Sequence, residues 1–284
     1  MAESLDGRTV FMSGGSRGIG LAIAVRAARD GARVALMAKT AEPHPKLPGT
    51  IHTAAEEIEA AGGEALPIAG DIRDAEAVER AVARTVEHFG GIDVVVNNAS
   101  AINLAPMGDL GVKRFDLMQQ INSRGTFVVT RACLPHLRES NAAHVLTLSP
   151  PLSTDPRWLR GHSAYTLSKM GMTMLTLGLA ADEAERGVAA NCLWPRTIIA
   201  TAAVQNLLGG DEAMARARTP EIMGDAAREI LVRDPRSCTG NAFIDDEVLA
   251  EAGITDLERY SASPDAELAL DLFVEGWPQP AGRV

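Results

Sequence analysis

Near its amino end the chain reads Ser13-Gly14-Gly15-Ser16-Arg17-Gly18-Ile19-Gly20. An apolar run at 9–12 precedes this stretch, and a helix-like pattern at 21–29 follows it. A strand, a glycine turn and a helix in this order are the context that a dinucleotide site requires. Glycine allows a tight turn and a close approach of the backbone to a pyrophosphate, and the first N–H groups of the helix then hold the anion. A tight turn without a ligand is the alternative that the glycines alone leave open.

The composition describes a globular protein with a large core, because 46% of the 284 residues are hydrophobic and 23% are charged. One α/β domain commonly reaches this length. The net charge of −10 argues against a nucleic-acid partner and an anionic membrane. The sequence has no apolar run of about 18 residues and no apolar signal core at its start, so we expect no membrane span and no secretory signal.

The cysteines and histidines favour a cytoplasmic protein without a bound metal. Cys133, Cys192 and Cys238 are far apart, which fits reduced thiols better than disulfides or zinc ligands. His44 and His52 have no third ligand in view, so we predict no metal site.

Short β-rich runs alternate with longer helical patterns along most of the chain. This alternation predicts an α/β fold with a doubly wound parallel sheet, the Rossmann fold, in a single domain. The expected strands are 9–12, 33–38, 65–70, 92–96, 144–149, 188–193 and 239–245. The expected helices include 21–29, 53–61, 74–89, 113–138, 197–208 and 220–232. We divide the chain into a nucleotide-binding domain at 1–245 and a C-terminal extension at 246–284.

The end of the second expected strand indicates which nucleotide binds. Folds that prefer NAD usually place Asp or Glu there, where it accepts hydrogen bonds from the ribose hydroxyls. Here Lys39 stands at that place, and Arg17 of the glycine turn adds a second cation. The pair predicts NADP(H), although each cation alone is compatible with a solvated surface charge. The proline-rich loop at 41–49 either closes over the adenosine end of the cofactor or is a surface connector.

Two further motifs come after the fourth and the fifth expected strands. Asn97-Asn98-Ala99-Ser100 follows the fourth strand, and Tyr165 and Lys169 are four residues apart, so they share one helical face. An isolated Tyr/Lys pair is common on protein surfaces. Together with the glycine spacing, these motifs resemble the short-chain dehydrogenase/reductase family over residues 9–245.

The resemblance implies hydride transfer between NADP(H) and a small-molecule carbonyl or alcohol substrate. Tyr165 is then the general acid/base, and the Lys169 ammonium lowers its pKa and binds the nicotinamide ribose. Asn122 breaks the helix at 113–138 and holds a water. A serine that polarises the carbonyl is either Ser149, which we favour, or Ser153. A homo-oligomer, a dimer or a tetramer, is expected through the helices around Asn122 and Tyr165.

The resemblance also implies a set of cofactor contacts and leaves two alternatives open. Ser100 replaces the family's usual Gly, and Arg196 stands where the family usually has Gly. These departures keep a catalytically weak NADPH-binding module open, and a lyase on the same fold is the other alternative. Trp158, His162 and Trp194 either line a pocket or simply pack. The implied cofactor contacts are Gly14, Ser16, Arg17, Gly18, Ile19, Gly20, Lys39, Asp71, Ile72, Asn98, Ala99, Ser100, Tyr165, Lys169, Pro195 and Thr197.

Overall fold

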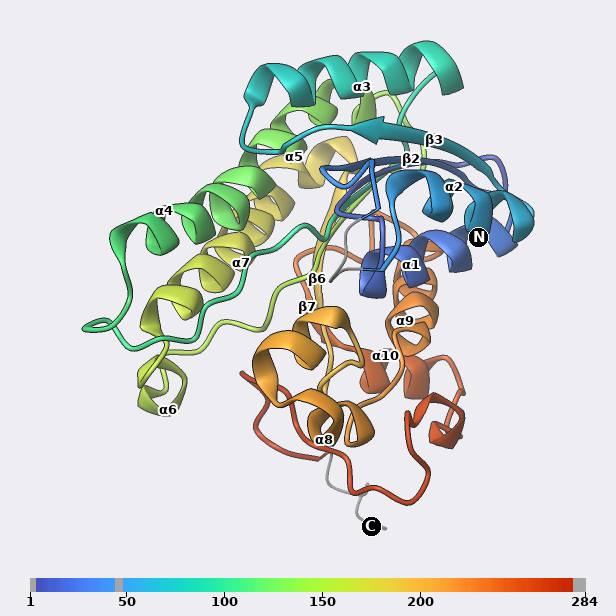
Figure 1. Ribbon diagram of the computed structural model, residues 1–284. Helices are drawn as coiled ribbons and strands as arrows, with labels where there is room; N and C mark the ends of the chain where they lie inside the picture. Colours follow the sequence, from blue (N-terminus) through green and yellow to red (C-terminus); the bar gives the residue numbers. More distant parts are fainter. Residues whose placement is uncertain (1–3, 44–47, 278–284) are drawn as a thin grey trace.

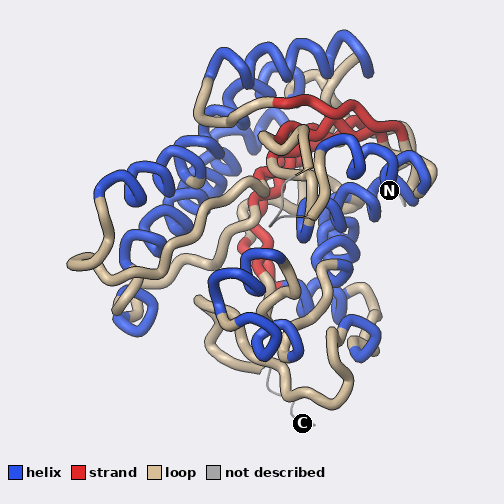
Figure 2. Tube along the Cα trace, viewed as in Figure 1, coloured by secondary structure: helices blue, strands red, loops and turns tan. Residues whose placement is uncertain are grey.

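The computed structural model describes residues 4–43 and 48–277, with a parallel sheet of seven strands at its centre (Figures 1 and 2). The strands lie in the order β3-β2-β1-β4-β5-β6-β7, so the direction of winding reverses between β1 and β4. The predicted doubly wound sheet in a single domain is confirmed. The strands are β1 Thr9–Ser13, β2 Arg33–Ala38, β3 Glu64–Ala69, β4 Val94–Asn97, β5 His144–Thr147, β6 Ala189–Trp194 and β7 Ala242–Ile244.

Helices cover both faces of this sheet. One face packs against α1, α2 and α9, and the other packs against α3, α5 and α7. The helices are α1 Gly18–Arg29, α2 Ile51–Ala60, α3 Ala75–Phe89, α4 Val112–Ile121, α5 Ser123–Leu137, α6 Pro156–Leu159, α7 Ser163–Glu183, α8 Gly210–Ala215, α9 Glu221–Leu231 and α10 Asp245–Glu251.

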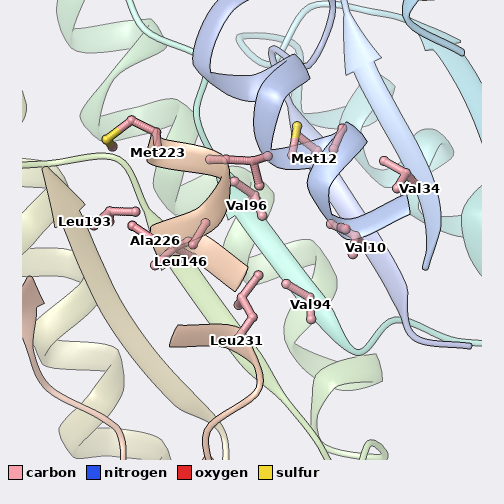
Figure 3. Close-up of a cluster of buried hydrophobic side chains, with 14 of the residues drawn as sticks. Val10, Met12, Val34, Val94, Val96, Leu146, Leu193, Met223, Ala226 and Leu231 are labelled. Atoms are coloured by element: carbon pink, nitrogen blue, oxygen red, sulfur yellow. The ribbon is translucent and has the colours of Figure 1, made fainter. Parts of the chain in front are cut away.

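The central strands are apolar throughout because both of their faces are buried. In β1, Val10 and Met12 join the core under α1 and α9, whereas Phe11 points into the core under α3 and α5. Figure 3 shows the first of these cores, in which Met223 and Leu231 of α9 approach side chains of the strands.

The long helix expected at 113–138 is two helices. It breaks at Asn122, whose backbone angles of φ −71° and ψ −82° end α4 and start α5. A break at Asn122 was expected from the family resemblance, and the structure has it.

The helix expected at 197–208 is wrong in its first part. Residues 202–208 are helical, whereas residues 197–201 are not. Thr197 instead forms an antiparallel bridge with Leu270, and Ile199 forms a bridge with Arg218. The backbone of this stretch is paired with segments distant in the sequence, and that pairing overrides the local helical pattern.

Residues beyond 245 pack into the same folded body. Val248 and Leu249 of α10 are fully buried beside α9, and Tyr260 is also buried. The chain then passes α8, where the Ala269 N–H donates to the carbonyl of Arg216, and returns to the end of β6 (Figure 1, red). Residues 270–272 therefore lie at the carboxyl edge of the sheet, where ligands bind in such folds.

Candidate active site

The glycine turn after β1 packs closely against the loop after β4. Gly14 and Gly18 have φ of +75° and +54°, a region that favours glycine. A Cβ on Gly14 would lie 2.8 Å from the Cα of Ala99, and one on Gly20 would lie 2.4 Å from the Asn98 amide nitrogen. Asn98 in turn donates to the carbonyl oxygen of Gly14 at 2.8 Å. The two loops therefore require glycine at these positions, as predicted.

The start of α1 fits an anion. Its N-cap residue, Arg17, is extended and supplies no side-chain hydrogen bond to the helix, and the first turn contains no acidic residue. The first N–H groups of a helix have no intrahelical partner, and the helix dipole favours negative charge there. These groups would hold the pyrophosphate of a dinucleotide.

The adenosine end of the expected site has more charge than the sequence indicated. Lys39 lies 3.3 Å from a carboxylate oxygen of Asp71, and Arg73 binds the same carboxylate at 2.6 Å. The hydrogen bonds from Arg73 lower the pKa of Asp71 to about 2. Arg17 donates to the carbonyl oxygens of Pro48 and Gly49 at 2.8 and 2.9 Å.

The structure thus adds Arg73 to the residues at this end of the site. The sequence already indicated this contact, because Arg73 follows Asp71 by two residues and lies within reach of its carboxylate. The loop at 41–49 touches the glycine turn, because a Cβ on Gly49 would lie 2.7 Å from the carbonyl oxygen of Ser16. Residues 44–47 of that loop, His44 among them, lie outside the described residues.

Asn122 joins the loop after β4 to α7. Its side-chain oxygen accepts from the Ala101 N–H at 2.7 Å, and its amide donates to the Ala101 carbonyl at 2.9 Å. The same amide donates to the Ser168 hydroxyl at 2.8 Å. Asn122 therefore holds Ser168, the residue next to Lys169 in the sequence. The water expected at Asn122 stays a prediction.

Tyr165 and Lys169 both lie buried on α7, one helical turn apart. The Lys169 ammonium donates to the carbonyl oxygen of Leu148 at 2.8 Å and lies 5.2 Å from the centre of the Trp194 ring. Burial lowers the pKa of Lys169 to about 7, against the attraction of Asp271.

The pKa of Tyr165 differs from the expectation. Burial raises the pKa of its phenol above the ordinary value, and the negative charge of Asp271 raises it further. The sequence predicted a lowered pKa through Lys169, but in the structure desolvation disfavours the phenolate and sets the direction of the shift.

Each candidate serine hydroxyl accepts a hydrogen bond from another residue. Ser149 is fully buried, and its hydroxyl accepts from Thr173 of α7 at 3.0 Å. The Ser153 hydroxyl accepts from the Asp155 N–H at 3.2 Å, in the turn before α6. Among the described side chains, neither forms a hydrogen bond with Tyr165 or Lys169.

The end of β6 carries one orphaned hydroxyl and one buried cation. The Thr197 side-chain oxygen is buried and has no partner among the described residues, as expected of a group that meets a ligand. Arg196 is also buried; it binds Asp246 at 2.6 Å, and it donates to Glu247 and to the carbonyl oxygen of Gly276. Arg196 therefore ties β6 to α10 and to the C-terminal segment.

The sequence reasoning missed Asp271 and Phe273, which reach the site from the carboxyl end. Phe273 packs among Trp158, His162 and Trp194, the three aromatic residues that the sequence had left open as pocket lining. Residues 270–274, Leu-Asp-Leu-Phe-Val, are an apolar run with one acid in an otherwise acidic tail, which was the available signal.

The family model for short chain dehydrogenases matches residues 8–210. The chain belongs to the short-chain dehydrogenase family. This assignment agrees with the resemblance read from the glycine turn, the Asn-Asn-Ala segment and the Tyr165/Lys169 pair.

Curated members of the short-chain dehydrogenase family refine the assignment. Hydroxysteroid dehydrogenase-like protein 2 of Xenopus tropicalis is 51% identical over 275 residues, which are 97% of this chain and 65% of that protein. The human protein of the same name is 48% identical over 279 residues, which are 98% of this chain and 66% of that protein. The chain thus spans just under two thirds of the length of these relatives. A likeness to this group was already apparent in the stretches 38–46, 148–152 and 193–197.

Two crystal structures resemble nearly all of the chain. A putative dehydrogenase from Xanthomonas campestris has a TM-score of 0.93 and 56% identity, covering 96% of this chain and 100% of its own. A short chain dehydrogenase from Mycobacterium thermoresistibile has a TM-score of 0.92 and 58% identity, covering 98% of this chain and 99% of its own.

Neither a membrane-spanning helix nor a cluster of metal ligands occurs among the described residues. In 4–43 and 48–277, no helix combines the length and the hydropathy that crossing a membrane demands. The same residues contain no group of three or more His, Cys, Asp or Glu side chains arranged to bind a metal ion.

Proposed function

We propose that the chain transfers a hydride between NADP(H) and a carbonyl or alcohol substrate, with Tyr165 as the general acid/base. The observation that carries this proposal is the placement of Tyr165 and Lys169 on one face of α7, at the carboxyl edge of the sheet, where Lys169 bonds to the Leu148 carbonyl after β5. The nicotinamide supplies the hydride when it is bound. The protein must then bind the nucleotide, orient the substrate and move one proton.

In this proposal Tyr165 donates a proton to the substrate oxygen during reduction and takes one from the alcohol during oxidation. A general acid/base is most effective when its pKa is close to the working pH. Lys169 helps when it is protonated, because a cation favours the phenolate. The Leu148 carbonyl holds the Lys169 ammonium in place at 2.8 Å, and Asn122 holds the neighbouring Ser168.

We propose NADP(H) rather than NAD(H) because of the charges at the end of β2. Lys39 and Arg73 present two cations against the single carboxylate of Asp71. No acidic residue takes the ribose-binding place next to Ala38. Two guanidinium or ammonium groups suit a 2′-phosphate.

The function is tested by NADPH oxidation at 340 nm against aldehydes, ketones, β-ketoacyl thioesters and ketosteroids. Saturable oxidation with one class supports the proposal and names that substrate class. Silence with every compound, in a protein that still binds NADPH, contradicts it.

A catalytically weak NADPH-binding module is the second candidate. It is favoured by the Ser149 hydroxyl, which is bound to Thr173 inside the fold. A protein without a positioned carbonyl-polarising donor loses part of its transition-state stabilisation. Tight NADPH binding without Tyr165-dependent turnover would decide for this candidate.

We also propose that the chain forms a homo-oligomer through α5 and α7 and works in the cytoplasm. Phe127 of α5 and Leu167 and Met174 of α7 expose 51%, 57% and 62% of their surface, which is unusual for large apolar side chains on a free surface. The three cysteines are buried and unpaired, as suits a reducing compartment.

A further inference from the structure

The C-terminal strap, which we define as residues 269–277, is tied on either side of its middle to residues at the end of β6. The Trp194 indole N–H donates to the Leu272 carbonyl at 2.8 Å, and the Arg196 guanidinium donates to the Gly276 carbonyl. Between these two anchors, the backbone groups of 273–275 form no hydrogen bond with any described residue. Side-chain contacts alone hold the middle of the strap, and a segment held in this way opens at a lower free energy than the core.

Phe273, in the middle of the strap, has an uncommon backbone conformation. Its φ is +70°, and no other non-glycine residue in the described part of the chain has a positive φ. A bulky residue in this region is strained and stays there only where the surrounding packing fixes it. Movement of the strap away from this position releases the strain, so the free energies of the two positions come closer together.

The Phe273 ring covers the expected general acid/base. Its centre lies 6.2 Å from that of the Tyr165 ring, and the two ring planes are inclined by 31°. Only 5% of the Tyr165 surface is exposed, and Phe273 itself is 4% exposed. A substrate oxygen has to come within about 2.6–3.2 Å of the phenol oxygen for proton transfer. The Phe273 ring therefore occupies space against Tyr165 that a carbonyl compound needs.

The present position of Phe273 also leaves two buried polar atoms without partners. The Trp158 indole nitrogen and the His162 Nε2 form no hydrogen bond with any described residue. The rings of both residues contact the Phe273 ring, with centres 5.8 and 6.1 Å from it. A buried polar group without a partner costs free energy, which hydration recovers. Movement of Phe273 admits water to both atoms, and this hydration favours opening.

We propose that the C-terminal strap is an autoinhibitory lid, closed in this structure, and that Phe273 has to move away from Tyr165 before a carbonyl compound can react. The anchors at Leu272 and Gly276 are the ends of the moving part, and residues 273–275 are the part that lifts. The consequence for catalysis rests on the proposed function, because the lid controls access to Tyr165. The movement itself does not depend on that function and is measured separately.

The movement is tested by labelling the thiol of Val274→Cys with 5,5′-dithiobis(2-nitrobenzoic acid). Val274 is 6% exposed and adjoins Phe273, whose ring this variant keeps. Glu275→Cys, at an exposed neighbour, gives the rate of an accessible thiol, and the fully buried native Cys133 and Cys192 report opening of the whole fold. We expect the thiol at position 274 to react at least about tenfold slower than the accessible thiol and at least about tenfold faster than the native thiols. A rate equal to either reference would overturn the proposal.

A second pair of variants tests whether Phe273 keeps the strap closed. Adding Phe273→Ala to Val274→Cys removes the ring contacts, so labelling at position 274 should become at least about tenfold faster. Phe273→Leu, which keeps an apolar side chain, should raise the rate by a smaller factor. An unchanged rate in both variants, or a rate that rises only together with those of Cys133 and Cys192, would overturn the proposal.

Turnover connects the lid to the proposed function. If only molecules with an open strap admit substrate, kcat/KM scales with the open fraction. Phe273→Ala should therefore raise kcat/KM for the best carbonyl substrate of the wild type at least about threefold. The matched control is Phe243→Ala, on β7 where Phe243 packs against Arg233, and it should stay within about twofold of the wild type. A fall or no change in Phe273→Ala would overturn the autoinhibitory role. No turnover in any variant, with the labelling as expected, would contradict the proposed function and leave the moving strap standing.

Discussion

At the scale of single residues, burial brings the pKa values of two side chains with very different ordinary values close together near neutral pH. Burial raises the pKa of Asp271 from 3.8 to about 7 and lowers that of Lys169 from 10.5 to about 7. Their mutual attraction opposes both shifts, and Asp245 adds to the shift of Asp271. Small changes around these residues therefore alter the charge beside Tyr165 at physiological pH.

Asp271 is expected to make stability fall as the pH rises from about 4 to about 7. In this window the folded chain keeps a proton that the unfolded chain has already lost, so higher pH favours unfolding. Lys169 acts in the opposite sense above about pH 7, where the unfolded chain keeps the proton that the folded chain releases. Asp271→Asn should make the loss between pH 5 and pH 7 smaller by roughly 2 kcal/mol in urea unfolding. Identical losses in the two proteins would refute this.

Lys39 is expected to set the nucleotide preference. Lys39→Asp restores the acid that accepts ribose hydroxyls in NAD-binding folds and removes one cation from the 2′-phosphate site. Its affinity for NADPH should fall at least tenfold while that for NADH rises, as measured by nucleotide fluorescence. The control is Arg84→Asp, at an exposed residue of α3. Similar affinities of the wild type for NADPH and NADH would contradict the assignment.

At the scale of elements, the break between α4 and α5 depends on one side chain. Asn122 satisfies the N–H and carbonyl groups of Ala101 and also holds Ser168 of α7. Three parts of the chain that build the site are therefore positioned by a single amide.

Asn122→Ala should cost about 1–3 kcal/mol of unfolding free energy, because it leaves buried backbone groups without partners. Urea unfolding checks this against Asn206→Ala, whose exposed amide donates to the Ala202 carbonyl and whose loss should stay within about 0.5 kcal/mol. A loss for Asn122→Ala no larger than that of the control would show that the break does not depend on this amide.

The sequence predicted the strands well because both of their faces are buried, so that Val10, Phe11 and Met12 are all apolar. It could not give the partners of Asn122, which lie 21 and 46 residues away. It also started the helix expected at 197–208 too early, because the backbone of Thr197 pairs with Leu270.

The candidate site was predictable to the extent that its motifs are local. The glycine turn and the Tyr165/Lys169 pair are short patterns with fixed spacing. Ser149 was favoured because it stands where the fifth expected strand ends, but the local sequence does not show that its hydroxyl accepts a hydrogen bond from Thr173 on another element. Phe273 arrives from the carboxyl end through contacts that no local pattern encodes.

At the scale of the whole molecule, the C-terminal segment returns to the carboxyl edge of the sheet and bonds to the residues at the end of β6. Arg196, the departure from the family's usual glycine, is buried and binds Asp246 and the Gly276 carbonyl. Its charge is compensated there by carboxylates, as a buried cation requires. The same residue therefore links the nucleotide side of the fold to the segment that carries Phe273.

The proposed assembly predicts a mass in solution that is a multiple of 30.0 kDa. Light scattering after size exclusion should give a dimer or a tetramer for the wild type. Replacing Phe127 and Met174 with Glu should shift the mass toward the monomer, because charge at the centre of an apolar interface is costly to desolvate. A monomeric wild type would contradict the assembly through α5 and α7.

The most direct test of the account is the effect of Tyr165→Phe on turnover and on NADPH binding, measured with the best substrate of the wild type. Loss of a general acid/base lowers rates by about 10²–10⁴. We predict a fall in kcat of that size with the dissociation constant for NADPH within about twofold of the wild type, because the hydroxyl is removed and the buried ring is kept. A variant that retains the wild-type kcat would contradict the assignment of Tyr165 and, with it, the proposed reaction at this site.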